Sequence, residues 1–489
     1  MRREMRIAEL VRRWPTAPAL AAAVLYGGTM AAAYPYRHVF ELDRDEGINA
    51  GKARLLEHGY ALYTQVWNDQ PPLFTHLLRA WFDAFGWDLD HGRGLVLVFA
   101  AALVFAVYDL TRLADGHRAA AIAALALAAS AYVQRLSVSL MIGLPAIALA
   151  TLAIWALFRW LDAPRVGWLL ASAALFGASL ATKLFTAFLL PVIALWLLAV
   201  TPADQARLRP ALLWVVSALV MSSLLLLALA GPQAAGQLLA PHLAGRHAPA
   251  LQHFDARGLL LTGGAEWLLS GLGGAAFAWL IWHRRTYLLI FPAWALTALA
   301  VLLTHAPVWY HHQLLLTVPY CPAIGVWLAE LSQHSPRSRG WLAMQRGAAC
   351  LAIVALLSAA ALHVLRAPRP PAADPRQAVV AALRQHLGPR RIAISTDPIY
   401  AFRAGASMPP GLAVLSSKRA ATDLQFEAEI AAAFEDGGPE AVALGPSAAG
   451  IDAALQRGMG ERYAAVFATE AGGGITVYAR RDLLTTAHP

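Results

Sequence analysis

The sequence predicts a polytopic α-helical membrane protein of about eleven transmembrane helices, followed by a small C-terminal α/β domain. Of the 489 residues, 58% are hydrophobic and 14% are charged, whereas soluble domains average roughly 45 to 50% apolar residues. Long uncharged runs are separated by short arginine-bearing connections. Because one soluble core cannot bury that much apolar surface, we expect most of the chain to lie in a bilayer.

The membrane part begins at the N-terminus. An arginine-rich start, Met1–Arg13, precedes an apolar stretch of about one membrane thickness, which favours an uncleaved first span over a signal peptide. The uncharged runs predict spans at residues 17–35, 94–111, 118–133, 138–158, 166–182, 184–200, 210–230, 265–282, 286–304, 312–330 and 346–365. Around Lys183 two spans adjoin without room for a loop, which predicts a tight turn or a broken, re-entrant pair.

The basic residues predict the orientation. Arginine-bearing connections all fall on the side of the N-terminus, at residues 112–118, 159–165, 207–209, 283–285 and 337–346. The positive-inside rule makes that side cytoplasmic, so the longer polar segments face outward. We therefore expect a multi-pass protein of the bacterial inner membrane with a cytoplasmic N-terminus, a transmembrane domain at 1–365 and a periplasmic or extracellular domain at 366–489.

The C-terminal domain follows a proline-rich linker at residues 367–375. Alternating patterns predict strands at 391–395, 441–444, 463–469 and 475–479, and helices at 377–387 and 422–434. The sequence of this domain has no glycine-rich phosphate loop, no cluster of metal-binding His and Cys, and no nucleophile elbow. We therefore expect it to cap the membrane domain or to bind a partner rather than to catalyse.

The net charge of +9 is also typical of nucleic-acid-binding proteins. The arginines, however, lie in short connections between apolar runs, where they interact with membrane-surface charge. We therefore expect membrane lipid, and no nucleic acid, as a partner. Cys321 and Cys350 both fall inside apolar runs, so the sequence offers neither a disulfide framework nor a CxxC metal site.

The first long loop, residues 36–93, holds side chains that can do chemistry. Asp43, Asp45 and Glu46 follow the first span almost directly, and carboxylates at that depth are costly unless they are solvated, paired or used. The adjacent pair Asp45 and Glu46 is the candidate catalytic pair. Helices are expected at 47–58 and, after the Gln70-Pro71-Pro72 break, at 73–85, both along the membrane surface.

Other polar residues near the bilayer are candidate ligands. Lys183 stands alone in apolar surroundings, where a lysine marks a ligand or a buried pair unless it snorkels to the interface. Arg93 precedes the second span and has the alternative reading of an interfacial anchor. His311 and His312 follow Tyr310 and point in different directions on a helix, so they are a poor metal pair by themselves. Either histidine is a candidate phosphate contact or a metal ligand together with Glu46.

The order of motifs in the first long loop is specific. An acidic pair follows the first span, then G-Y-A-L-Y, then N-D-Q-P-P-L, then a glycine and Arg93 before the second span. In this order the loop resembles the bacterial branch of the protein mannosyltransferase and aminoarabinose transferase superfamily, glycosyltransferases of the C fold (GT-C) that are grouped as family 39 and its relatives. The resemblance covers roughly the first 200 residues, and the plan of many spans plus an outer C-terminal domain is also similar.

The resemblance implies a hexosyl- or pentosyltransferase that takes its sugar from a polyprenyl-phosphate donor in the outer leaflet and gives it to an envelope glycan, lipid or protein. It implies that Asp45, paired with Glu46, is the general base and that Lys183 binds the donor phosphate. It also implies substrate contacts for Arg93, Tyr63, Gln70, Tyr310, His311 and His312. The residues agree with this chemistry, because sugar transfer from a phosphate needs a base for the acceptor and cations for the leaving group. Whether a divalent metal ion takes part is left open.

One departure from the family's pattern keeps other functions open. In the turn at 132–139, Arg135 stands where many relatives have a second acidic residue. The protein is then either an active relative with a different substrate or a noncatalytic subunit of an envelope-assembly machine. A transporter or lipid flippase is a further alternative, because charged residues in a bundle also line transport pathways. Against it, the sequence shows no inverted repeat and the first long loop is helix-rich.

Overall fold

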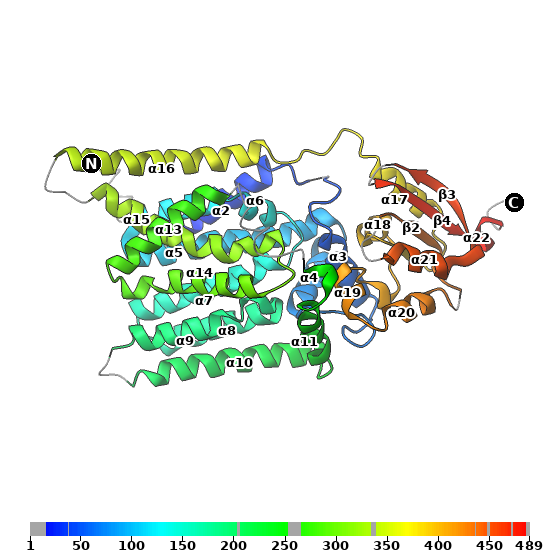
Figure 1. Ribbon diagram of the computed structural model, residues 1–489, viewed down its shortest axis with the longest axis horizontal. Coiled ribbons are helices and arrows are strands. Elements are labelled where there is room, and N and C mark those ends of the chain that lie inside the picture. The colour runs from blue at the N-terminus through cyan, green and yellow to red at the C-terminus, as the bar shows by residue number, and fades with distance from the viewer. Residues whose placement is uncertain are drawn as a thin grey trace.

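The computed structural model describes residues 16–37, 39–202, 206–252, 266–333, 339–435, 437–446, 450–470 and 473–485. These residues form a helical bundle and an α/β domain that lies at one end of it (Figure 1). The bundle helices are α2 (Ala17–Ala33), α5 (Leu89–Ala128), α7 (Gly143–Asp162), α8 (Val166–Thr182), α9 (Leu189–Val200), α10 (Leu208–Ala230), α13 (Trp267–Trp282), α14 (Ile290–Thr304), α15 (Leu314–Gln333) and α16 (Arg339–Leu365).

Length and exposed apolar surface identify the bundle as a membrane domain. Within the described ranges, six helices are long and apolar enough to cross a bilayer, and four shorter apolar helices accompany them. Helices α10 and α16 bury few of their side chains, and Leu224 of α10 and Leu351 of α16 are 57% and 71% exposed. Lipid, and not water, accommodates apolar surface of that extent. The predicted class of fold is therefore confirmed, while the number of spans stays a prediction.

Helix α5 contains the spans predicted at 94–111 and 118–133 as two helical stretches that meet at a sharp kink. The backbone leaves helical geometry at Asp115 and Gly116, inside the connection expected at 112–118. Gly116 has φ +84, a conformation that glycine adopts without the steric cost of a Cβ atom. The chain thus changes direction within two residues.

The region after α5 differs from the prediction. The helix ends at Ala128, and residues expected at the end of the third span belong to the short helix α6 (Ala131–Ser137). Ser130 causes the interruption: its hydroxyl accepts a hydrogen bond from the Val133 amide at 3.1 Å and caps the new helix. The next span begins at Gly143 rather than at 138.

The chain around Lys183 forms the tight turn that its short length predicts. Helix α8 ends at Thr182, Lys183 is extended, and the 3₁₀ turn η1 (Leu184–Thr186) leads into α9. The Ser179 hydroxyl donates to the Ala146 carbonyl at 2.8 Å, which ties the end of α8 to α7. Lys183 is therefore held at the end of the bundle that carries the α/β domain.

Three helices occupy the same end of the bundle: α3 (Asp45–Glu57), α4 (Leu73–Phe85) and α11 (Ala234–Gly245) (Figure 1). The first two are the helices expected in the first long loop. Pro72 precedes α4 because a proline has no amide proton to leave unpaired at a helix start. Gly86 ends α4 with φ +103, so the chain turns there towards α5.

The α/β domain has a four-stranded sheet of order β1-β2-β4-β3, in which β1 and β2 are parallel and the other pairs are antiparallel. The strands are β1 (Ala393–Ser395), β2 (Ala441–Leu444), β3 (Tyr463–Thr469) and β4 (Ile475–Arg480). The helices are α17 (Arg376–Gln385), α18 (Pro398–Ala404), α19 (Ser417–Thr422), α20 (Phe426–Ala433), α21 (Ile451–Met459) and α22 (Arg481–Thr485). The predicted strands are all present.

The α/β domain is docked on the first long loop. Helix α18 packs on α3 so closely that a Cβ atom on Gly47 would overlap the backbone nitrogen of Ile399. Arg403 donates hydrogen bonds to the carbonyl oxygens of Val39 and Phe40 at 3.0 and 2.7 Å. The loop that follows the first span is thus fixed between the bundle and the domain.

Candidate active site

Asp45 lies at the first turn of α3, where the loop, the bundle and the α/β domain meet. Its backbone amide donates to the Asp43 carboxylate at 3.1 Å, while its own carboxylate has no hydrogen-bond partner among the described residues. Asp45 is solvent-exposed, yet the surrounding protein raises its pKa to about 6. Desolvation is the largest cause and the charge of Asp43 adds to it, whereas Lys183 and Lys52 act in the opposite direction. An accessible carboxylate with this pKa fits a general base.

Glu46, the other member of the acidic pair, is fully buried and points away from solvent. Its carboxylate accepts two parallel hydrogen bonds from the Arg93 guanidinium, at 2.9 and 2.7 Å. It also accepts the backbone amides of Leu42 and Leu140, each at 2.8 Å. The Arg93 guanidinium also donates hydrogen bonds to the Asp90 carboxylate and to the carbonyl oxygens of Tyr36 and Val39. Glu46 and Arg93 therefore anchor α3 to α5 and to the segment between α6 and α7.

Lys183 lies near Asp45, and the charge of each residue shifts the pKa of the other. The ammonium group is 3.4 Å from Nε2 of His311 and 4.9 Å from the ring centre of Phe185. A Cβ atom on Gly143 would come within 4.0 Å of both Lys183 and His311, so the glycine leaves room at this point. The predicted phosphate ligand and one of the predicted histidines thus lie together.

Tyr310 and Arg135 border the same site. The Tyr310 hydroxyl donates to the Asp43 carboxylate, and the Arg135 guanidinium lies 4.9 Å above the Tyr310 ring. Arg135 also donates to the Leu42 carbonyl at 2.6 Å. The residue that stands in place of a second acid therefore holds the segment that leads to Asp45.

Tyr63 and Gln70 shape the loop rather than face Asp45. Tyr63 adopts φ 66, and its hydroxyl donates to the Gln70 carbonyl at 2.6 Å. Gln237 of α11 closes the same turn, because it donates to the Tyr63 carbonyl and accepts from the Asn68 amide. These bonds place Asp69 between α3 and α11.

Sequence reasoning missed Asp69 and its partner Lys418, which comes from α19 of the α/β domain. The Lys418 ammonium is 2.7 Å from the Asp69 carboxylate and 2.9 Å from Nδ1 of His242. The other nitrogen of His242 donates to the Asp69 carbonyl at 3.0 Å. Burial alone would raise the pKa of Asp69, but Lys418 and His242 hold it well below its usual value. Asp69 is therefore a carboxylate at neutral pH.

The site contains every lysine of the chain. Of the 39 basic residues, only Lys52, Lys183 and Lys418 are lysines. Lys52 projects from the same face of α3 as Asp45, seven positions on, and donates to the Asn68 side chain at 3.0 Å. Lys183 interacts electrostatically with both Asp69 and Lys418. The rarity of lysine was the signal in the sequence that could have identified Lys418.

The described residues do not assemble a metal centre: no group of three His, Cys, Asp or Glu lies close enough to hold an ion. His312 accepts the Trp309 amide at Nδ1, at 3.0 Å, and its ring centre is 4.7 Å from that of His311. Glu46 is engaged by Arg93 and does not reach either histidine. The sequence left the part of a divalent ion open, and these residues do not decide it.

Comparison with known proteins bears on this site. Residues 69–228 match the sequence model of the dolichyl-phosphate-mannose-protein mannosyltransferase family. No curated protein matches the chain. Among solved structures, the fold is similar to ArnT from Cupriavidus metallidurans bound to undecaprenyl phosphate, with a TM-score of 0.67, 16% identity and 96% of this chain and 98% of that chain covered. The apo form of ArnT gives a TM-score of 0.67, 15% identity and the same coverage.

The archaeal oligosaccharyltransferase AglB from Archaeoglobus fulgidus, in complex with an inhibitory peptide and a dolichol-phosphate, is also similar. Its TM-score is 0.57 at 13% identity, with 98% of this chain and 75% of that chain covered. These likenesses show that the chain has the C-type glycosyltransferase fold. Together with the family match at residues 69–228 they support the predicted resemblance to glycosyltransferases of the C superfamily.

Proposed function

We propose that this chain, a membrane glycosyltransferase of the C-type fold, moves a sugar from a polyprenyl-phosphate donor to a hydroxyl or amine of an envelope acceptor. The observation that supports it is the position of an accessible carboxylate, Asp45, beside the three-lysine cluster (Lys52, Lys183 and Lys418). The two halves of the reaction need these two kinds of group, a base and a set of cations. ArnT was solved with undecaprenyl phosphate, which is the donor's lipid-phosphate chemistry.

In the proposed reaction, Asp45 accepts the proton of the acceptor nucleophile as the nucleophile forms a bond to the anomeric carbon. The bond between that carbon and the phosphate oxygen breaks, and its electron pair leaves with the polyprenyl phosphate. Lys183 neutralises the charge that develops on this phosphate, and Lys418 and Lys52 add to the positive field. Attack from the side opposite the phosphate inverts the anomeric centre.

Other residues position these groups. The Glu46–Arg93 ion pair fixes the start of α3, and with it Asp45, relative to α5, and Glu46 also ties it to Leu140 between α6 and α7. Tyr310 holds Asp43, whose negative charge keeps the pKa of Asp45 raised. His311 contacts Lys183 from the opposite wall and, by lying within 3.4 Å, limits the directions that the ammonium can take.

The proposed orientation places the site on the outer face of the bacterial inner membrane. The arginine-bearing connections lie at the end of the bundle remote from the α/β domain, and the positive-inside rule assigns that end to the cytoplasm (Figure 1). The N-terminus is then cytoplasmic, and the α/β domain is periplasmic.

The test is transfer of radiolabelled sugar from a panel of polyprenyl-phosphate sugars by the purified full-length protein. Asp45→Asn is expected to abolish transfer while binding of undecaprenyl phosphate is retained. Asp83→Asn is the matched control, because Asp83 lies on α4 in an exposed ion pair with Arg79. A wild-type protein that neither binds nor consumes any donor would contradict the proposal and favour transport or assembly. Donor consumption that is equal in wild type and Asp45→Asn would refute the role of Asp45.

A further inference from the structure

A polar cavity lies at the contact between the first long loop and the α/β domain. It measures about 340 Å³, within the roughly 300 to 1,000 Å³ of ligand sites. Arg54 of α3 lines it, nine positions after Asp45, so the two side chains project from opposite faces of the helix. The cavity is therefore separate from the site around Asp45.

The cavity is strongly positive. Four arginines from four segments line it, Arg54, Arg384, Arg391 and Arg403, and Asp88 is its one acidic residue among those described. The Asp88 carboxylate caps α5 by accepting the Asp90 amide at 2.8 Å. No ion pair joins any of the four arginines to a described carboxylate.

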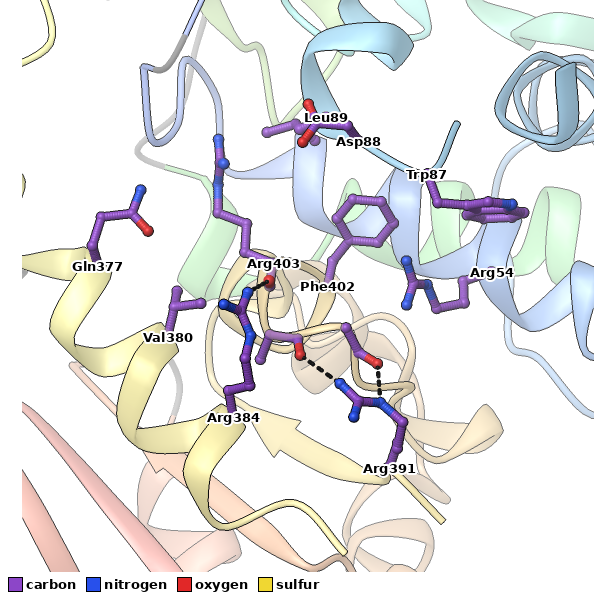
Figure 2. Close-up of a pocket in the computed structure, with 12 residues that line it drawn as sticks. Arg54, Trp87, Asp88, Leu89, Gln377, Val380, Arg384, Arg391, Phe402 and Arg403 are labelled. Carbon is purple, nitrogen blue, oxygen red and sulfur yellow. Dashed lines mark hydrogen bonds between the residues drawn. The ribbon is translucent and has the colours of Figure 1, made fainter. Parts of the chain in front are cut away.

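Backbone carbonyl groups hold three of these guanidinium groups in place, as Figure 2 shows for two of them. Arg384 donates to the Arg403 carbonyl at 2.9 Å, and Arg391 donates to the carbonyls of Gly405 and Ala404, each at 3.0 Å. Arg403 donates to Val39 and Phe40 in the same way. Carbonyl partners fix the direction of a guanidinium group but, being uncharged, do not neutralise it.

Arg54 is the least satisfied of the four. It stacks between Phe402 and Trp87, with its guanidinium carbon 4.7 and 5.4 Å from the two ring centres (Figure 2). Its Nε is buried without a hydrogen-bond partner. Burial is the largest influence on the pKa of Arg54 and lowers it; the charge of Glu57 opposes this shift, and that of Arg391 adds to it. A guanidinium stays protonated at neutral pH. An anion in the cavity would relieve this unfavourable positive charge.

We propose that this arginine cavity (Arg54, Arg384, Arg391 and Arg403) binds a phosphate group, independently of the sugar-donor site. Guanidinium forks match the oxygens of phosphate two at a time, and several arginines around one group are the usual way to bind it. The cavity also adjoins the start of α5, whose N-terminal backbone dipoles favour an anion. The phosphate belongs either to a lipid headgroup at the membrane surface or to a soluble molecule.

The experiment is calorimetric titration of the purified full-length protein in detergent with two probes, inorganic phosphate and dihexanoyl phosphatidylglycerol. Wild type is expected to bind at least one of them. Arg54→Gln is expected to weaken that binding about tenfold, as for one lost charge-assisted hydrogen bond. Arg391→Gln, a change at an exposed residue that leaves the core intact, is expected to act in the same direction.

Arg457→Gln is the matched control, because Arg457 is an exposed arginine of the same domain outside the cavity. Tighter binding of phosphatidylglycerol than of inorganic phosphate assigns the site to a lipid headgroup, and the reverse assigns it to a soluble phosphate. The proposal is overturned if wild type binds neither probe, or if Arg54→Gln and Arg391→Gln bind as the control does. Undecaprenyl phosphate binding, measured in the same preparations, is expected to be unchanged in both variants and tests the donor site separately.

Discussion

The ion pair between Lys418 and Asp69 can be tested by replacing each partner in turn. The two substitutions are expected to change the affinity for the donor phosphate in different directions. If Lys418 serves the donor phosphate, Lys418→Met removes a charge-assisted hydrogen bond worth about 1.5 to 3 kcal/mol. Each 1.4 kcal/mol is about a factor of ten in affinity, so the Kd for undecaprenyl phosphate rises about 10- to 100-fold. The side chains are only 15% and 13% exposed, so solvent screens the interaction little.

Asp69→Asn replaces the acidic partner of the same ion pair. It removes a negative charge from the vicinity of the donor phosphate and releases the Lys418 ammonium from its 2.7 Å contact. The expected result is donor binding that is unchanged or tighter by up to about tenfold, a gain of about 1.4 kcal/mol at most. The His242 contact survives, because it is made to the Asp69 backbone carbonyl.

The assay is equilibrium binding of undecaprenyl phosphate to full-length protein at low and high salt, with the melting temperature measured on every sample. Arg457→Met is the control, since it removes an exposed cation from the same domain. If Lys418→Met and Asp69→Asn weaken binding equally, the ion pair only docks the α/β domain, and the assignment of Lys418 to the donor site is refuted.

Three further outcomes are expected. Sugar transfer by the wild type should decline as the pH falls through about 6, because the raised pKa of Asp45 means that protonation removes the base there, and a pH–rate profile without this limb would contradict its role. Asp45→Asn should not lower the melting temperature, because a carboxylate with a raised pKa destabilises the folded state once it ionises. Glu46→Gln should reduce the free energy of unfolding by about 3 to 5 kcal/mol, the cost of breaking a buried ion pair, whereas Asp83→Asn at a surface pair should cost less than about 1 kcal/mol in the same denaturant titration. Gly47→Leu should loosen the α/β domain, because its side chain would occupy the position of the Ile399 backbone, and limited proteolysis should then cleave the linker faster than in wild type.

The sequence by itself determined the features that depend on neighbouring residues. Uncharged runs of membrane length placed the bundle helices, and Pro71 and Pro72 placed the start of α4. The strand predicted at 441–444 has the same bounds as β2. Asp45 could be singled out because its position after the first span and its neighbouring motifs lie in one continuous loop. The predicted end of a span was wrong where a single side chain interrupts an apolar run, as Ser130 does between α5 and α6.

Only the tertiary structure decided what the polar groups do. Glu46 and Arg93, 47 positions apart, were read as site residues, and the fold joins them in a buried pair. Lys418 and Asp69 meet across 349 positions. The rarity of lysine could single out Lys418, but only the tertiary structure shows that it joins Asp69 and completes the lysine cluster. The physical reason is that hydrophobic periodicity fixes which face of a helix is buried, whereas the partner of a charged side chain is fixed by the docking of whole segments.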